Sequence, residues 1–417
     1  MLVVSDSGHG RIMYTNPARD TRTGESCLRE FIADDCPPRD GADGDTGSDD
    51  FHRCLTFGAH HDNSSGEDVM EVAYARYLDG LYNLPGALAR FIPTHPPQMV
   101  WNFDTVTFTT GPLAATCTGP SSEDVCGFRM PHAMIAATDP AERIVADTLN
   151  SRLVWARPPT TGTIGEGVRV MDASTPEWGE ALYPNNVELH VRDGSTFLLV
   201  TYKGSDSTVS GNKRLGRIML WDITNPDAPR RVWAFPESGY LAASHGGVVR
   251  TLYGQELLVY AHAFGASADL DHGDQGSVGL ARMSWDAPPT YLGDLVMDDG
   301  YPAFGFVRAV DLLASGPADG IATDADHAEL VVTDSACENQ DAECSFTGGV
   351  IEAVVEDLPD DAGLSGAWSA DHAQQRWIPL GSALDPFQAE LKFPYQAVPV
   401  AVSALVGVMK EPVDACP

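Results

Sequence analysis

The feature that most constrains the fold of this chain of 417 residues is a strand pattern that recurs along it. Three apolar runs, LVVSDS, RIVADT and ELVVTDS, each end in Asp followed by Ser or Thr, at Asp6, Asp147 and Asp334. Two further runs, FLLVTYKG and ELLVYAHAFG, lie between the same kinds of turn-forming cluster but lack the Asp. Helical periodicity is nearly absent, so the chain is predicted to be all-β and built from repeats.

Each repeat contains about four strands. A short segment that opens with a polar residue precedes most of the apolar runs, and edge-like strands such as GRIMLWDIT and RRVWAF follow them. The openings recur roughly every 60 residues, and dividing the 417 residues by six gives about 70 per unit. Units of this kind cannot bury both faces alone, and they stack radially into a β-propeller.

We therefore predict a single domain over residues 1–417, a six-bladed β-propeller, with seven blades as the alternative. The last blade is expected to combine a C-terminal inner strand within 398–406 with N-terminal strands at 2–5 and 10–14. Such closure joins the chain ends and removes an open sheet edge. Two insertions interrupt the pattern: an acidic loop at 37–51 and a cysteine-bridged loop at 111–128.

Charge and hydropathy exclude several partners. The chain has 26 Lys and Arg against 59 Asp and Glu, which gives a formal net charge of −33. Such a surface repels phosphate backbones and no basic stripe offsets it, so we expect no nucleic-acid partner. No stretch of about 18 apolar residues occurs, so no transmembrane segment is expected. Hydrophobic residues make up 43% of the chain, enough for a large core.

The eight cysteines indicate an oxidising compartment. Cys117 with Cys126, and Cys337 with Cys344, each close a short polar loop, as local disulfides do, and none has the CxxC spacing of a zinc site. We expect a secreted, periplasmic or surface-anchored protein whose signal peptide has been removed; free cytosolic cysteines are the alternative. The remaining cysteines, which allow three connectivities, are Cys27, Cys36, Cys54 and Cys416.

The residues that open the units are predicted to form the functional site. In a propeller the first strand of each blade lines the central channel, so these residues face one axis. We expect them to bind a ligand, with ordered water as the alternative occupant. His190, on the same strand as Glu188, is either a further substrate-binding residue or a satisfied core histidine. The ring comprises His61 (or His60), His132, Asn186, His245 and Arg308, with Tyr395 or Gln396 from the closing blade.

Arg308 favours an anion over a metal at this ring. Three histidines could bind Zn, Cu or Fe. A guanidinium that faces the same cavity opposes a bare divalent cation, whereas it binds sulfate, phosphate or carboxylate through paired hydrogen bonds. A histidine beside it can act as nucleophile or as general acid–base near neutral pH. The predicted catalytic residues are His245, His132, His61 and Arg308.

Three other groups are expected to be structural or only weakly metal-binding. Asp before Ser or Thr at a strand end caps a turn through local hydrogen bonds, so the repeated aspartates are expected to be structural. Trp155, Trp221, Trp233 and Trp285 are expected in the core between blades. Close carboxylates can bind calcium, but neither acidic loop completes the twelve-residue pattern, and a solvated loop is favoured. The calcium candidates are Asp269, Asp271 and Asp274, and Asp40, Asp43 and Asp45.

The run PHAMIAATDPAERIVADTLNSRLVW resembles the blades of NHL-like propellers and, more closely, of bacterial arylsulfotransferase-type propellers. The specific stretches are HHD at His60, PH at His132 and SHGG at His245. The resemblance implies channel histidines and an arginine that hold a sulfuryl group, with one histidine carrying it between phenolic donors and acceptors and no nucleotide cofactor. His245, His132 and Arg308 match best. The pattern differs in two respects: no obvious N-terminal β-sandwich is expected in these residues, and Asn186 stands where another histidine would be expected.

Three functions remain open on the sequence. The first is a transferase or hydrolase that acts on a small anionic or phenolic substrate in the channel. The second is a non-catalytic extracellular propeller whose outer loops bind a partner. The third is a calcium-dependent or metal-dependent hydrolase, such as a lactonase or phosphotriesterase, or a polysaccharide lyase. The sequence requires no cofactor, and calcium remains a candidate.

Overall fold

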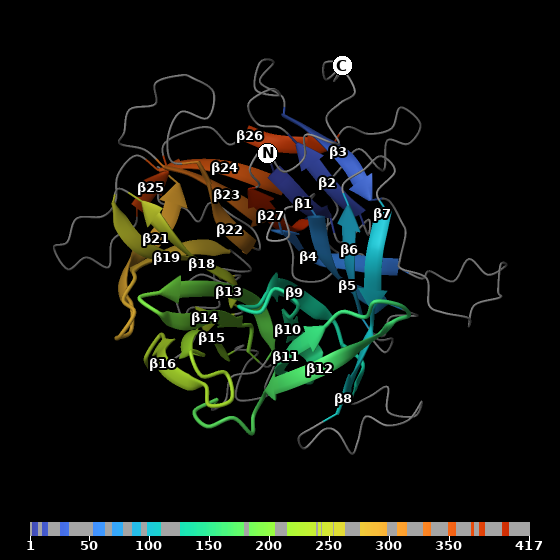
Figure 1. Cartoon of the computed structure of the whole chain (residues 1–417). Helices are drawn as coiled ribbons and strands as arrows, with labels where there is room; N and C mark the ends of the chain where they lie inside the picture. Colours follow the sequence, from blue (N-terminus) through green and yellow to red (C-terminus); the bar gives the residue numbers. More distant parts are fainter. Residues whose placement is uncertain are drawn as a thin grey trace.

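A computed structural model shows a radial arrangement of β-strands (Figure 1). Within the described residues every element is a strand except the 3₁₀ segment η3 (Thr148–Asn150), which confirms the all-β prediction. The same residues contain no helix with the length and apolar character needed to cross a membrane. The described residues are 2–6, 11–15, 26–32, 53–62, 69–77, 86–92, 98–109, 126–178, 183–204, 215–238, 241–242, 244–252, 254–262, 276–297, 307–314, 328–334, 349–355, 368–370, 375–379 and 394–399.

Antiparallel strands that pair in chain order form the repeating unit. One sheet has β4 (Arg53–Asp62), β5 (Val69–Tyr77), β6 (Ala87–Ile92) and β7 (Gln98–Phe103). A second has β9 (Pro131–Ala136), β10 (Arg143–Asp147), β11 (Arg152–Arg157) and β12 (Ile164–Met171), with β8 (Thr105–Phe108) added in parallel. A third has β13 (Pro184–Arg192), β14 (Ser195–Tyr202), β15 (Leu215–Asp222) and β16 (Arg230–Phe235), with β17 (Leu241–Ala242) paired to β15.

We call each run of antiparallel strands that pair in chain order a meander. The fourth sheet has 13 strands because short strand pairings join several meanders to one another. Parallel pairs link β21 to β25 and β26 to β3. Hydrogen bonding therefore gives four sheets in the described part of the chain, where the sequence predicted six, or alternatively seven, separate ones. The strands of this sheet are β18 (Ser244–Leu252), β19 (Gln255–His262), β20 (Ser277–Arg282), β21 (Thr290–Met297), β22 (Val307–Ala314), β23 (Ala328–Asp334), β24 (Gly349–Val355), β25 (Trp368–Ala370), β26 (Gln375–Pro379), β27 (Pro394–Pro399), β1 (Leu2–Asp6), β2 (Arg11–Thr15) and β3 (Ser26–Ile32).

The N-terminal and C-terminal strands pair as predicted. Strand β1 lies between β2 and β27, and it is antiparallel to both. In the pairing with β27, Val3 is opposite Val398 and Val4 is opposite Ala397. Residues 400–406, the rest of the expected inner strand, lie outside the described part. The chain is thus closed on itself by hydrogen bonds between its two ends.

The first strands of the successive meanders form a ring. In the described structure β4 contacts β9, β9 contacts β13, β13 contacts β18, β18 contacts β22, β22 contacts β27, and β27 contacts β4. These strands lie toward the centre of Figure 1, with the later strands of each meander outside them. This is a β-propeller arrangement, and it places the openings of the first strands around one axis.

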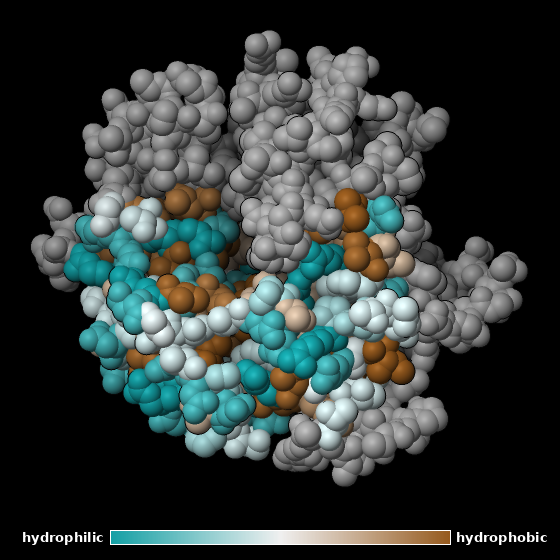
Figure 2. Space-filling model, in the orientation of Figure 1, coloured by the Kyte–Doolittle hydropathy of each residue, from teal (hydrophilic) through white to brown (hydrophobic). Residues whose placement is uncertain are grey.

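Side chains packed between neighbouring meanders make the core. One cluster contains Trp155 of β11 and Trp221 of β15, and another contains Trp233 of β16 with Leu258 of β19. The predicted core position of these three tryptophans is confirmed. Trp285 differs, because it follows β20 and is only half-buried. On the face shown in Figure 2, hydrophilic and neutral residues cover most of the described surface, and the apolar residues form small separate patches.

The turn after β10 shows why Asp recurs at strand ends. Asp147 is completely buried, and its carboxylate accepts hydrogen bonds from the Arg129 amide (2.7 Å), Asn150 Nδ2 (2.9 Å) and Arg152 Nε (2.6 Å). These contacts fix η3 and the hairpin to β11, so the structural role predicted for Asp147 is confirmed. Asp6 and Asp334 end β1 and β23, but their side chains lie outside the described part.

The predicted insertions fall mostly outside the described residues, as do the calcium candidates in the acidic loops. Cys126 is buried and disulfide-bonded. Cys117, its expected partner, is outside the described part, and so are Cys337 and Cys344. The two disulfide pairings therefore stay predictions.

Candidate functional site

His132 lies at the start of β9 with its ring held by two oxygen atoms. Its side chain is buried, and Nδ1 lies 2.9 Å from the carbonyl oxygen of Met130 and 2.7 Å from Oγ1 of Thr148. A carbonyl oxygen only accepts hydrogen bonds, so the hydrogen-bond network assigns the proton to Nδ1. The neutral ring therefore carries its lone pair on Nε2.

His132 is neutral at pH 7. Burial holds the pKa of His132 well below its usual value of 6.5, because desolvation disfavours the imidazolium. The positive charges of Lys203 and Arg308 lower the pKa further, while the Met130 carbonyl raises it. Lys203 follows β14 and Arg308 lies on β22. Two cations from different meanders therefore lie within electrostatic range of this imidazole.

The hydroxyl of Thr148 connects His132 to the next meander. Thr148 Oγ1 donates to the carbonyl oxygen of Pro184 at 2.6 Å and accepts from Nδ1 of His132. Pro184 is the first residue of β13. This buried contact fixes the ring of His132 relative to the neighbouring first strand, because each partner of the hydroxyl belongs to a different strand.

His245 and Arg308 are in direct contact. Both are buried, on β18 and β22, and Nη1 of Arg308 donates to Nε2 of His245 at 2.7 Å. A guanidinium has donors and no acceptor, so Nε2 carries the lone pair and the proton of the neutral ring is on Nδ1. The contact orients the guanidinium at the opening of its strand. The structure thus brings together two residues that the sequence placed on one axis.

The amide that belongs to this group is Asn185 rather than the predicted Asn186. Asn185 is buried and donates to the backbone carbonyl of His245 at 2.8 Å. Asn186 is half-buried and makes a longer contact of 3.4 Å with the carbonyl of Gly247. The register of β13 against β14 shifts between Pro184 and Asn186, and this β-bulge turns the side chains at the strand opening.

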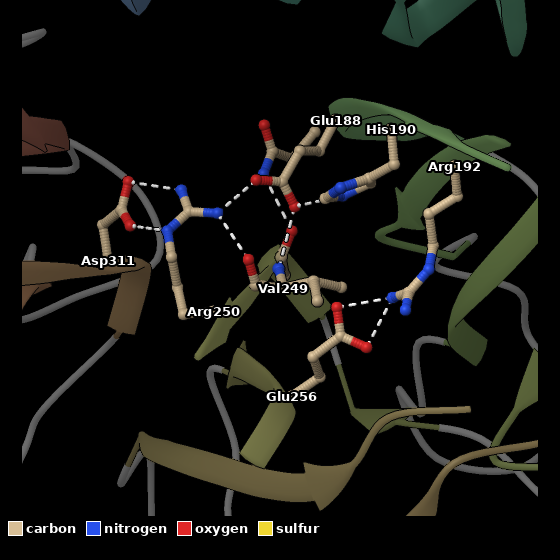
Figure 3. A network of polar contacts seen from close by, with 9 residues as sticks. Glu188, His190, Arg192, Val249, Arg250, Glu256 and Asp311 are labelled. Carbon is tan, nitrogen blue, oxygen red and sulfur yellow. Dashed lines mark hydrogen bonds and ion pairs between the residues drawn. The ribbon is translucent and has the colours of Figure 1, made fainter. Parts of the chain in front are cut away.

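A second polar layer lies further along the same first strands (Figure 3). Arg250 of β18 binds Glu188 of β13 through Nη1, and its Nε and Nη2 donate to the Asp311 carboxylate of β22 at 2.6 and 2.9 Å. Burial raises the pKa of Glu188, but the His190 hydrogen bond and the charge of Arg250 outweigh it and leave that pKa below its usual value. Burial raises the pKa of Asp311, and Arg250 offsets this only in part.

His190 belongs to this second layer and not to the group around His245. Its Nε2 lies 3.0 Å from Oε2 of Glu188, and its ring meets Trp285 edge-on at a centroid distance of 5.1 Å. Glu188 also accepts from the Val249 amide at 2.8 Å. His190 is therefore a half-buried packing and hydrogen-bonding residue in the structure, which favours the structural alternative considered for it.

Several predicted site residues are placed only by their backbone or not at all. His60 and His61 lie on β4, and Tyr395 and Gln396 lie on β27, so all four are on first strands of the ring. Their side chains are outside the described part, as are Asp269, Asp271 and Asp274. Among the described side chains, no group of three or more His, Cys, Asp or Glu residues is placed to hold a metal ion.

Lys203 and Thr148 were not predicted as site residues, and the sequence did not distinguish Asn185 from Asn186 as the amide that contacts His245. Lys203 is the second-last residue of the run FLLVTYKG and one of only four lysines in the chain, which was an available signal. Thr148 follows the recurring Asp, where its hydroxyl looked like part of a turn. Arg250 and Asp311 were also not predicted as site residues, although each lies on the same strand as a predicted one: Arg250 follows His245 on β18, and Asp311 follows Arg308 on β22.

No protein-family model matches the chain, and no curated protein matches it. Solved structures show weak similarity. An α-L-arabinanase from Penicillium chrysogenum, complexed with arabinobiose, is 10% identical over 80% of this chain and 86% of that chain, with a TM-score of 0.42. A candidate 6-phosphogluconolactonase from Bacteroides fragilis is 11% identical over 95% and 96%, with a TM-score of 0.45.

A β-fructofuranosidase from Bombyx mori is 10% identical, with a TM-score of 0.34. The match covers 70% of this chain and only 60% of the length of that enzyme. None of these three is described as an arylsulfotransferase, so that resemblance stays a prediction. At these TM-scores the similarities assign no activity to the chain, whose β-propeller arrangement rests on its own strand pairing.

Proposed function

We propose that this chain is a propeller enzyme that binds an anionic ester beside His132, His245 and Arg308 and transfers or hydrolyses its charged group. The observation that carries the proposal is the buried contact between Arg308 and His245, within electrostatic range of a neutral His132. A guanidinium is charged at any relevant pH and donates in fixed directions, so it suits a sulfate, phosphate or carboxylate group. His245 fixes that direction.

His132 supplies the second part of the chemistry. Because its Nδ1–H is bound to the Met130 carbonyl, Nε2 holds the lone pair. An imidazole that is neutral at pH 7 can accept the proton of a hydroxyl or water that attacks the central atom and displaces the ester's alcohol or phenol. Alternatively, Nε2 can attack that atom itself: the bond to the ester oxygen breaks, the alcohol or phenol leaves, and the group passes from the imidazole to an acceptor hydroxyl or water. Both routes need an anion oriented nearby, which is the role proposed for Arg308. The reaction is therefore of the sulfuryl-type transfer or hydrolysis class.

The proposed scaffold is a propeller of six units in an oxidising compartment. The cycle of contacts through β4, β9, β13, β18, β22 and β27 supports the count, because each of these strands begins a meander. The disulfide at Cys126 supports a secreted or periplasmic location, since such bonds persist outside the reducing cytosol.

The direct test is turnover of chromogenic aryl esters. Purified full-length protein is mixed with 4-nitrophenyl sulfate or 4-nitrophenyl phosphate, with and without a phenolic acceptor, and release of 4-nitrophenol is followed. We expect release by the wild type, its loss in His132→Asn, and at least a tenfold reduction in Arg308→Lys, because an ammonium cannot reproduce the paired contact. Arg230→Lys on the exposed edge of β16 is the matched control.

Two negative results together would contradict the enzyme proposal. If neither ester turns over and inorganic sulfate or phosphate does not raise the melting temperature, the enzyme proposal is wrong. The non-catalytic binding propeller, with the ring as a structural channel, would then be the function to pursue.

A further inference from the structure

The first strands that carry the proposed anion site share one irregularity of the backbone. The pairing of β9 with β10 skips His132, because Pro131 and Ala133 are opposite successive residues of β10. A residue skipped in this way is the extra residue of a β-bulge. The pairings of β13, β18 and β22 with their second strands also skip one residue each at the strand opening, and all four skipped side chains are buried. The other three skipped residues are Asn185, His245 and Arg308.

Each bulge falls at the same place in the repeat. On the second strands it lies opposite the step into Asp147 and Asp334, the aspartates that end two of the recurring apolar runs. In the two repeats without the aspartate it lies opposite the equivalent step, into Tyr202 and His262. A bulge changes the direction of the side chains at its strand, so its place marks equivalent positions of the ring.

The two remaining first strands have the same bulge. The pairing of β27 with β1 skips Tyr395, opposite the step into Asp6. The pairing of β4 with β5 skips Phe57, because Thr56 and Gly58 are opposite successive residues of β5. The register therefore gives β4 an equivalent position that holds Phe57.

His60 and His61 lie further along β4 than the bulge. They follow Phe57 by three and four residues. Glu188 and Asp311, which belong to the second layer, also lie three residues beyond the bulges of their own strands. Counted from the bulge, His60 thus has the register of the second layer, and His61 lies one residue beyond it.

We infer that Phe57, and not His61, is the sixth residue of the ring, and that the site selects an anion that carries an apolar group. This deepens the proposed anion site and rests on it. The bulge positions form a closed ring, because β27 contacts both β22 and β4, and β4 contacts β9. The positions of Tyr395 and Phe57 are therefore neighbours in the ring.

The residue types in the ring determine the kind of ligand. Four consecutive positions hold two imidazoles, an amide and the guanidinium of Arg308, and a guanidinium suits an oxyanion. The other two positions, those of Tyr395 and Phe57, hold aromatic residue types, which gain free energy from contact with apolar groups and with other rings. A ligand that uses the whole ring has a charged end and an apolar end, whereas a bare anion uses the polar positions alone.

Binding of benzenesulfonate and methanesulfonate to the full-length protein tests the inference, by isothermal titration calorimetry at pH 7.5 and constant ionic strength. Both ligands carry the same singly charged sulfonate and have no ester bond, so they differ only in the apolar group and are not turned over. We expect the wild type to bind benzenesulfonate about tenfold more tightly than methanesulfonate, or better, because the phenyl group adds aromatic contact.

Variants assign the preference to the two aromatic positions. Phe57→Ala and Tyr395→Ala should each weaken benzenesulfonate by about fivefold or more and change methanesulfonate by less than about twofold. Phe57→Leu keeps an apolar side chain of similar size, so it tests the ring contact should Phe57→Ala fail to fold, and it should weaken benzenesulfonate about threefold; Phe57→Tyr should keep the preference. Arg308→Met should weaken both ligands. The matched control is Tyr291→Ala, which removes an exposed aromatic side chain from the outer strand β21 and should change neither affinity.

The outcomes distinguish this inference from the proposed function. Equal affinity of the wild type for the two sulfonates overturns the selectivity and leaves the anion site standing. Loss of the preference in His61→Ala, with Phe57→Ala or Phe57→Leu unchanged, would assign the sixth position to His61 and overturn the inference. Failure of both sulfonates to bind also overturns it. If inorganic phosphate in the same titration fails to bind as well, the proposed anion site is wrong.

Discussion

Breaking the buried ion pair between Glu71 and Arg143 should destabilise the protein by about 3 kcal/mol. Glu71 lies on β5 and Arg143 on β10, both side chains are almost fully buried, and the pair joins two neighbouring sheets. Arg143 Nε donates to both carboxylate oxygens, at 2.9 and 2.7 Å, and Nη2 is 2.7 Å from Oε1. Removal of one partner of a buried pair typically costs 3–5 kcal/mol, roughly, because the other charge stays buried.

The structure places the loss for Glu71→Gln at the lower end of that range. After the change Arg143 still donates to two backbone carbonyls, those of Pro140 (2.7 Å) and Glu142 (2.9 Å). Arg90 also lies beside this carboxylate, with Nη1 3.4 Å from Oε1 of Glu71, and its side chain is partly exposed. Glu71→Leu combined with Arg143→Met removes both charges of the fully buried pair and leaves only the partly exposed Arg90, so the double variant should be more stable than Glu71→Gln.

Urea unfolding followed by circular dichroism measures these differences. Glu166→Gln is the matched control, because Glu166 pairs with Arg157 at 3.4 Å while both side chains are more than 40% exposed. An exposed pair contributes about 0–1 kcal/mol, so the control should shift the midpoint little. A Glu71→Gln loss no larger than that of the control, or a double variant less stable than Glu71→Gln, would refute the reasoning about the buried charge.

Three further predictions follow from the same contacts. Gly279→Ala should destabilise by about 1–3 kcal/mol in urea unfolding, since a Cβ would lie 2.1 Å from the ring of Tyr260; an unchanged midpoint would contradict this. Thr148→Val should cost about 1–3 kcal/mol because the buried Pro184 carbonyl loses its donor, and Thr148→Ser should restore it. The free energy of unfolding should fall as the pH drops below 6.5, because the unfolded chain protonates His132 while the folded one does not; His132→Asn should flatten this slope.

The sequence was sufficient to predict the repeating strands and their closure because both depend on local patterns. Apolar runs bounded by turn residues mark the second strand of a meander, and residues that open the first strands must face the axis. His245 and Arg308 follow from that rule alone. The number of sheets does not follow, because the short strands β25 and β26 join meanders through parallel contacts that no local pattern encodes.

The missing site residues are those whose position depends on contacts between strands. Asn185 replaces Asn186 because of a β-bulge, and a shift of one residue reverses which side chain faces the site. Lys203 follows β14, the second strand of its meander. A comparison of the residues that open the first strands therefore does not identify it. The ion pairs of Arg250 link three meanders, and pairing between distant segments is visible only in three dimensions.

The pairing of β1 with β27 has a consequence for synthesis of the protein on the ribosome. Domains generally fold as units while the chain emerges from its N-terminus. Here β1 must wait for residues 394–399, with which it pairs, although they are separated from it by almost 400 residues. Until that segment has been translated the ring stays open, and the strands that carry His132, His245 and Arg308 are not held around a common axis. Closure of the ring therefore requires that residues 394–399 have left the ribosome.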